Sequence, residues 1–227
     1  MPSSTQSHRG RAAAHGDGAR DALERAIVEG ELAAGEPLRE GPLAARLGTS
    51  RTRARDALQE LAAIDLVRTD PDEGYRVTPF EPVRLAQLVQ VAAALSGTAA
   101  RLALPHLTPD DRAWLDQAEG HLFAFDVPVS GVHPYGPFVV DVFVLRSGND
   151  VLQEQLRRLQ PHVLRLVRQF GRGVTQAGMA RRTGGTMAAL RAGDAHLLGE
   201  SVRVFFEDVG MELVRALEDS RVDRSRA

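Results

Sequence analysis

A close succession of three short helical segments and a hairpin, within residues 19–78, constrains the fold of this chain more than any other feature. Apolar residues recur there at the i, i+3, i+4 and i+7 spacing of one helix face, and glycines and prolines separate the segments. The expected helices span 19–29, 41–47 and, after a cap at Thr49 or Ser50, a stretch that ends near Ile64. The expected strands span 66–69 and 75–78. This order of elements predicts a winged helix-turn-helix.

The remainder of the chain is expected to be helical almost throughout. Residues 79–85 contain Pro79 and Pro82 and form the expected linker. The segment 138–145 fits a strand or a buried helix by its pattern alone, and its helical surroundings favour a helix. The expected helical segments are 83–104, one that begins at Thr108, 138–145, 151–170, 174–191 (interrupted by Gly184-Gly185) and 194–217.

The two ends of the chain, residues 1–18 and 220–227, lack helical periodicity and are expected to be flexible tails. The predicted fold class is therefore mainly α. It consists of an N-terminal winged helix-turn-helix over 19–78 and a C-terminal all-helical bundle of about six helices over 86–219.

Composition excludes several classes of protein. The 227 residues include no cysteine, which rules out disulfides, thiolate metal sites and thiol nucleophiles. We find no secretory leader and expect no membrane span, so a cytoplasmic protein without a membrane partner is predicted. No P-loop, G-x-S-x-G, G-x-G-x-x-G or H-E-x-x-H motif occurs, and we expect neither an enzyme nor a cofactor.

All 28 basic residues are arginine and none is lysine. The composition bias of a GC-rich genome explains this, whereas phosphate binding by guanidinium groups requires the arginines to cluster. Residues 1–80 hold 11 arginines against 13 acidic residues, so the N-terminal domain as a whole is not basic. Between residues 44 and 68, five arginines face three acidic residues. This modest local excess suits specific DNA binding better than indiscriminate binding.

The start of the third helix carries the strongest candidate site for nucleic acid. Arg51 and Arg55 are four residues apart with Thr52 beside them, opposite the apolar stripe, and Gln59 continues this face. Guanidinium and hydroxyl groups at a helix N-terminus suit contacts to phosphates and base edges, and arginine–guanine is the commonest specific pair. Arg53 is nearer the apolar edge, which favours a phosphate or surface role. A solvated charged helix face is the alternative interpretation.

The run PLREGPLAARLGTSRTRARDALQELAAIDLV, followed by DPDEGYRVTPF, resembles the DNA-binding module of GntR-family transcription regulators over about residues 20–80. The resemblance implies a sequence-specific regulator, commonly a repressor, that binds a palindromic operator in double-stranded DNA as a homodimer. It implies that the recognition helix spans Ser50–Ile64. The DNA contacts that it implies fall on Arg39, Ser50, Arg51, Thr52, Arg53, Arg55 and, at the tip of the wing, Gly74.

Two positions depart from the family pattern. Arg53 stands where many members have proline, and Gly41-Pro42 replaces the usual acidic pair before Leu43. The second departure weakens the assignment of Arg39, which lies just before that pair.

Two further stretches, RSGNDVLQEQLRRL and AALRAGDAHLLGESV, resemble the C-terminal domain of the FadR-type (FCD) subfamily. Members of that subfamily often bind a divalent metal through one Asp and three His. The resemblance places those four positions at Gly136, Val140, Thr183 and Phe205, whose side chains cannot bind a metal. No metal site is therefore expected.

A second pair of subfamily residues is also replaced. Ala92 and Ser96 stand where the first helix of that domain commonly has an Arg and a Glu. A buried arginine is an obvious partner for a carboxylate ligand, so its replacement by Ala92 weakens the interpretation of an organic acid as ligand.

The helical domain either senses a small molecule or serves as a dimerisation scaffold. A sensor without metal would take a rather apolar effector, and a cavity of ~300 Å³ or more would favour this interpretation over a filled core. The candidate pocket residues are Leu95, His133, Tyr135, Val140, Phe143, Arg165, Arg168, Met187 and Phe205.

Overall fold

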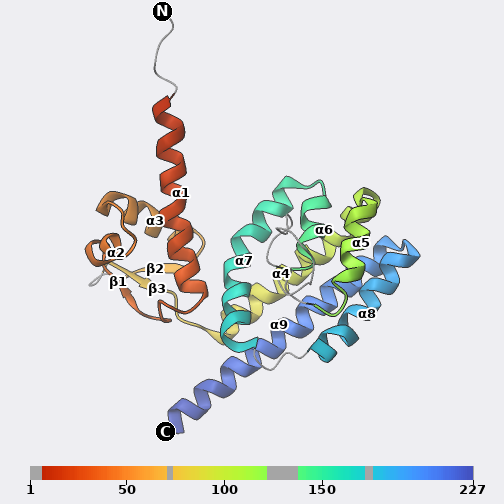
Figure 1. Ribbon diagram of the computed structural model, residues 1–227. Helices are drawn as coiled ribbons and strands as arrows, with labels where there is room; N and C mark the ends of the chain where they lie inside the picture. The colour runs from red at the N-terminus through yellow and green to blue at the C-terminus, as the bar shows by residue number, and fades with distance from the viewer. Residues whose placement is uncertain (1–6, 71–73, 122–137, 172–175, 227) are drawn as a thin grey trace, which may run out of the picture. The chain divides into compact units, whose positions relative to one another are not determined.

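The computed structural model describes residues 7–70, 74–121, 138–171 and 176–226. The chain divides into two compact units, Met1–Glu81 and Pro82–Ala227, and the division falls within the expected linker. Each unit has a hydrophobic core of its own, so each is described by itself (Figure 1). The chain is mainly helical, as predicted, and in the described residues the sheet is confined to the first unit.

The first unit is a winged helix-turn-helix. The apolar faces of three helices meet the inner face of a small sheet, and Leu23, Leu58 and Leu61 are fully buried between them. Its elements are α1 (Ser7–Val28), β1 (Pro37–Leu38), α2 (Glu40–Arg46), α3 (Arg51–Ala63), β2 (Val67–Asp70) and β3 (Gly74–Val77).

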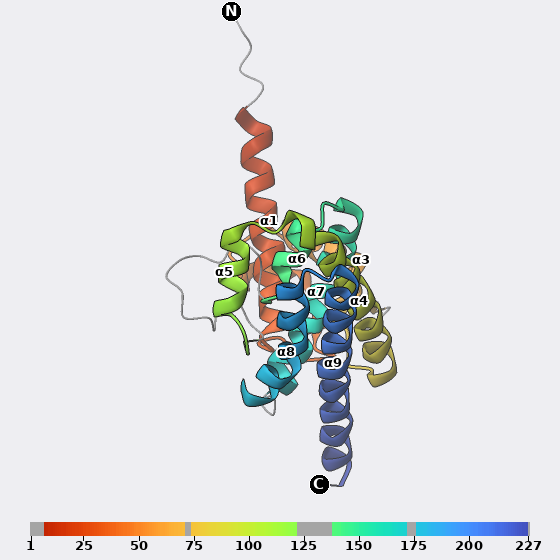
Figure 2. The same cartoon turned by 90° about the vertical axis from the view of Figure 1, so that its right-hand side faces the viewer.

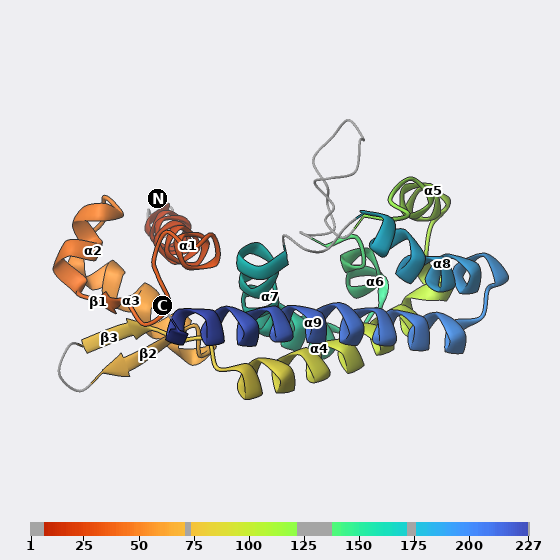
Figure 3. The ribbon, with the colours of Figure 1, turned by 90° about the horizontal axis from the view of Figure 1, so that it is seen from below.

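The sheet is antiparallel, with β3 in the middle of the order β1-β3-β2 (Figure 3). In the β2–β3 hairpin, Val67 pairs with Val77. Gly74 begins β3 with φ +87°, a conformation that glycine adopts without strain. Strand β1, which pairs Leu38 with Tyr75, was not predicted, because a strand of two residues has no readable periodicity.

The second unit is an all-helical domain, with six α-helices and one 3₁₀ turn among its described residues. Helices α4 and α9 lie side by side and form its spine, α8 packs against α9, and α6 and α7 pack against α4 (Figures 2 and 3). The elements are α4 (Pro82–Ala103), η1 (Leu104–His106), α5 (Pro109–Gln117), α6 (Asp141–Arg146), α7 (Asp150–Phe170), α8 (Gln176–Ala192) and α9 (Ala195–Arg226).

Glycines allow α4 and α9 to approach closely. A Cβ atom built on Gly97 of α4 would lie 2.5 Å from the carbonyl oxygen of Gly199, and one built on Gly199 would lie 2.7 Å from the carbonyl oxygen of Gly97. One end of the crossing is tight as well, because a Cβ on Gly210 would lie 2.3 Å from Val89 Cγ1. A side chain at Gly97 or Gly199 would therefore meet the facing backbone, and one at Gly210 would meet the side chain of Val89.

Residues 82–106, α4 together with η1, form one stretch that is long and apolar enough to cross a membrane by length and composition alone. No stretch of this length and hydropathy was expected from the sequence. In the described structure α4 packs against α9, α6 and α7, and half of the apolar window is buried within the domain. These contacts are those of a core helix.

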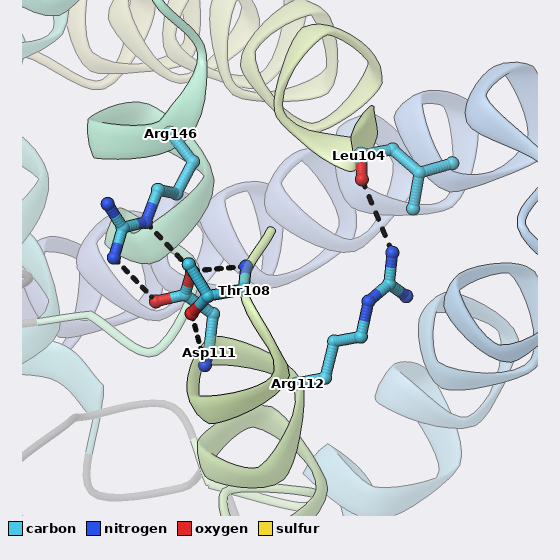
Figure 4. Close-up of polar contacts among 5 residues, drawn as sticks. All are labelled: Leu104, Thr108, Asp111, Arg112 and Arg146. Atoms are coloured by element: carbon cyan, nitrogen blue, oxygen red, sulfur yellow. Dashed lines mark hydrogen bonds and ion pairs between the residues drawn. The ribbon is translucent and has the colours of Figure 1, made fainter. Parts of the chain in front are cut away.

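Asp111 is a fully buried carboxylate that ties α5 to α6 (Figure 4). Its two oxygens accept hydrogen bonds from Arg146, at 2.8 Å from Nε and 3.0 Å from Nη2. Asp111 also completes a capping box with Thr108, the helix start that the sequence predicts. The bidentate pair with Arg146 neutralises the charge of Asp111, which would be costly to bury alone. The next residue, Arg112, donates a hydrogen bond to the carbonyl oxygen of Leu104 at 3.3 Å.

Three segments differ from the expectations drawn from the sequence. Helix α1 begins at Ser7, inside the expected tail 1–18, because residues 12–14 are alanines with high helix propensity. Helix α9 continues to Arg226 rather than ending near residue 217, since its last turns contain neither glycine nor proline. Helix α8 runs through Gly184-Gly185 without a break, because a glycine costs only about 1 kcal/mol in a helix interior.

Candidate nucleic-acid interface and ligand pocket

The N-terminal end of α3 presents a polar face to solvent. Ser50 caps the helix, and its hydroxyl oxygen accepts a hydrogen bond from the backbone N–H of Arg53 at 3.3 Å. The opposite stripe of the helix, which includes Leu58, is buried in the core. The exposed side chains of the first turn and a half are Arg51, Thr52 and Arg55. The helix thus offers two guanidinium groups and a hydroxyl at its positive dipole end.

The side chain of Arg51 forms neither an ion pair nor a hydrogen bond with any described residue. Its guanidinium lies close to Gly41 of α2, such that a methyl group on that residue would be 3.6 Å from Nη2. The GntR resemblance leads us to expect an acidic pair where Gly41 and Pro42 stand. Glycine there leaves Arg51 without the partner that an acidic side chain could provide.

Arg55 is held by an ion pair to α2. Its Nε atom donates to Glu40 Oε1 at 2.7 Å, and this hydrogen bond raises the pKa of the guanidinium. The other nitrogens of Arg55, Nη1 and Nη2, form no hydrogen bond with the described residues. A guanidinium held at Nε presents these two donors outward, which suits bidentate recognition of guanine or phosphate.

The remaining described residues predicted to contact DNA lie next to α2, on α3 and at the start of β3. Arg39 is the exposed N-cap residue of α2, Arg53 is half-buried on α3, and Gly74 is exposed at the start of β3. A Cβ atom on Gly74 would meet nothing within 4 Å, so its surroundings are open. The rest of the wing tip, residues 71–73, is outside the described residues.

The sequence of the first unit matches a known protein family. Residues 16–77, which run from α1 to β3, match the family described as bacterial regulatory proteins, gntR family. The match covers most of the N-terminal unit, which is therefore similar to the DNA-binding domains of that family. The match contains every element that positions Arg51, Thr52 and Arg55.

A curated relative is the "Probable D-xylose utilization operon transcriptional repressor" of Paenarthrobacter nicotinovorans, 42% identical over 84 residues. The alignment covers 37% of this chain and 37% of the relative. The chain therefore matches little more than a third of that protein's length.

Solved structures support the same architecture over more of the chain. The E. coli protein McbR/YncC is 21% identical with a TM-score of 0.62, covering 84% of this chain and 92% of that one. A Rhodococcus sp. RHA1 protein assigned to the GntR transcriptional regulators is 17% identical with a TM-score of 0.66, covering 88% and 97%. At these identities the likeness shows a shared fold: a winged domain followed by a helical domain.

The positions where the FadR-type resemblance places metal ligands lie together in the helical domain. Val140, Thr183 and Phe205 all line one small cavity of about 20 Å³, and Gly136 is outside the described residues. Valine and phenylalanine offer no donor atom, and the Thr183 hydroxyl donates to the carbonyl oxygen of Met179 at 3.1 Å. These residues therefore do not fit a divalent metal.

The residues predicted for an effector pocket are not gathered around one large cavity. Val140, Phe143, Met187 and Phe205 line the small cavity just described. On α7, Arg168 is exposed and Arg165 is buried, and burial lowers the pKa of Arg165 to about 10. Leu95 is half-buried on α4, and His133 and Tyr135 lie outside the described residues.

A larger pocket, of about 270 Å³, lies between α4, α6, α7 and α9. It shares no lining residue with the small cavity at the former ligand positions. Ala92 and Ser96, which stand where the subfamily commonly has Arg and Glu, line it with small side chains. Its other polar lining residues are Asp141, Gln153, Arg157 and Gln160, and its apolar walls include Phe138, Leu156, Val163 and Phe206.

Asp141 is the buried acid of this pocket, only 9% exposed. Its Oδ2 atom accepts hydrogen bonds from the backbone N–H of Phe138 at 2.8 Å and from Gln160 Nε2 at 3.2 Å. Burial raises the pKa of the carboxyl group to about 7, and the two hydrogen bonds oppose this shift in part. Asp141 is not among the residues that the sequence predicts for an effector pocket, so its place in this pocket was missed.

Proposed function

We propose that this chain is a sequence-specific DNA-binding transcription regulator, a cytoplasmic repressor that binds a palindromic operator as a homodimer. The observation that carries the proposal is the exposed face of Arg51, Thr52 and Arg55 at the capped start of α3. This face belongs to a gntR-family domain, and the curated relative is itself named as a repressor.

The chemistry of that face supports readout in the major groove. A bidentate arginine–guanine contact contributes about 1–3 kcal/mol of discrimination against the wrong base. Arg51 has no internal partner in the described structure, and Arg55 keeps both terminal nitrogens available. Arg39, Ser50 and Arg53 on or beside α2 and α3, and Gly74 on the wing, complete the proposed DNA contacts.

The homodimer follows from how such domains read DNA. Two recognition helices related by a two-fold axis enter successive major grooves about 34 Å apart, which is why the operator is a palindrome. We assign dimerisation to the helical domain, whose α4–α9 spine is rigidly packed.

A sensor is favoured over a pure scaffold for the helical domain. The pocket of about 270 Å³ is smaller than the ~300 Å³ set as the criterion for a sensor, so its volume does not decide; the buried carboxylate that it contains favours a ligand site over a filled core. A bound effector would act by favouring one arrangement of the DNA-binding domains over another. An effector-independent scaffold is the second candidate.

The test begins with selection of genomic DNA fragments by the purified full chain. Fluorescence anisotropy then compares the recovered operator with a scrambled duplex of the same composition. We expect a preference of at least ~10³-fold at physiological salt, and lower expression of a reporter placed behind the operator when the chain is co-expressed. Equal affinity for the two duplexes would overturn the proposal, and activation of the reporter would overturn repression alone.

A further inference from the structure

We propose that the pocket between α4, α6, α7 and α9 binds a small organic cation, an amine on an apolar body about the size of one ring, through the carboxylate of Asp141. The inference rests on the proposed function in one respect only, namely that the bound molecule acts as the effector of the regulator. The binding site itself is argued from the residues of the helical domain.

Among the described residues of this domain, the buried carboxylates of Asp111 and Asp141 have different partners. Asp111 receives a bidentate pair from Arg146, whereas no arginine or histidine among the described residues pairs with Asp141. Both hydrogen bonds to Asp141 reach Oδ2, and no described residue donates to Oδ1. A buried carboxylate is stable in its ionised form only with a cationic partner or further donors. An ammonium group bound in the pocket would supply both.

The size and the walls of the pocket define the rest of the ligand. A cavity of ~150 Å³ is known to hold benzene, so about 270 Å³ accommodates one ring with a short chain. Phe138 and Phe206 meet edge to face at 6.3 Å and both line the pocket, and aromatic faces attract cations as well as rings.

The other charged lining residue is Arg157, whose positive charge would disfavour a bound cation. The competing outcome is therefore that the pocket prefers anions. The Arg157 side chain is 62% exposed and paired with Glu154, so its charge lies largely in solvent. If the pocket instead selected anions, Arg157 would be the group responsible.

The test uses isothermal titration calorimetry on the full chain with three probes of similar size: phenethylamine, 2-phenylethanol and 3-phenylpropanoate. At pH 8.5 we expect the amine to bind at least tenfold more tightly than the alcohol or the acid. Between pH 8.5 and pH 5.5 the amine should lose about thirtyfold in affinity, because Asp141 becomes protonated. The affinity for the alcohol should not change, which controls for the titration of groups other than Asp141. Equal binding of amine and alcohol, or tighter binding of the acid, would overturn the inference.

Two variants locate the site. Asp141→Asn should abolish the preference for the amine while the alcohol still binds, and Asp219→Asn, the same change at an exposed position of α9, should have no effect. Leu156→Trp should exclude all three probes by filling the pocket. Full amine affinity in both pocket variants would overturn the inference, even if one of them folds poorly.

Operator binding measured on the same wild-type samples separates the two proposals. Operator preference without amine binding overturns this inference and leaves the proposed function standing. Amine binding without operator preference overturns the proposed function and leaves the site standing.

Discussion

At the residue scale, two arginines one helical turn apart on α3 are held in different ways. Arg51 lies against Gly41 with no partner in the described structure, whereas Arg55 is anchored at Nε by Glu40. The first arrangement leaves a flexible cation, and the second fixes the direction of a guanidinium fork. We therefore expect Arg55 to depend on Glu40 for its specificity.

Glu40→Gln tests this dependence. The variant loses a negative charge beside the proposed DNA face and weakens the charge-assisted hydrogen bond that holds the fork of Arg55, so affinity for scrambled DNA should rise while operator affinity should not. The ratio of the two affinities, measured by anisotropy, should fall about three- to tenfold, a loss of about 1 kcal/mol in discrimination.

Glu31→Gln is the matched control for that experiment. Glu31 accepts from Arg46 at 3.0 Å in another exposed pair of the same unit, so the charge change is identical. A specificity ratio that is unchanged in Glu40→Gln, or that falls equally in Glu31→Gln, would show that Glu40 does not position Arg55.

The sequence was a good guide to the candidate DNA contacts and a poor guide to the pocket. Arg51, Thr52 and Arg55 are local to one helix, and their common face follows from a period of 3.6 residues. The Arg55–Glu40 pair joins residues 15 apart, and the burial of Asp141 depends on four helices that pack around it. Such contacts are products of tertiary packing, which no local pattern encodes.

At the element scale, the spine of the helical domain depends on the absence of side chains at the α4–α9 crossing. From sequence alone, Gly184-Gly185 was interpreted as an interruption of its helix. The structure separates two kinds: Gly97 and Gly199 permit contact between backbones, whereas Gly184 and Gly185 have nothing within 4 Å of a built Cβ. To distinguish the two kinds of glycine from the sequence, one would have to know which helix packs against each of them.

Gly199→Ala should destabilise the helical domain. Its Cβ would lie 2.7 Å from the carbonyl oxygen of Gly97, and such overpacking costs typically ~1–3 kcal/mol, more than the gain of ~1 kcal/mol in helix propensity. Urea denaturation followed by circular dichroism gives the change in the free energy of unfolding.

Gly185→Ala provides the comparison within the same domain. Nothing lies within 4 Å of its built Cβ, so only the propensity gain applies and the variant should be stabilised by about 0.5–1 kcal/mol. If both substitutions stabilise the protein, the two helices are not in backbone contact at Gly199.

At the scale of the whole molecule, a domain similar to the gntR family, with modest local positive charge, precedes a helical domain in which Val140, Thr183 and Phe205 stand where the resemblance places metal ligands. A DNA-binding unit that is not basic overall depends on a few directed contacts rather than on a general field. The central claim is therefore that Arg51 and Arg55, at the start of α3, read the operator.

The measurement that tests this claim most directly is operator affinity, by fluorescence anisotropy, of the wild-type chain and of Arg51→Ala and Arg55→Ala. Arg215→Ala, at an exposed position of α9, is the control for loss of one positive charge. Analytical ultracentrifugation verifies that each variant keeps the wild-type oligomeric state. The account predicts that each α3 variant loses about 1–3 kcal/mol per protomer in discrimination between operator and scrambled DNA, while Arg215→Ala loses none. Full operator affinity in both α3 variants would contradict it.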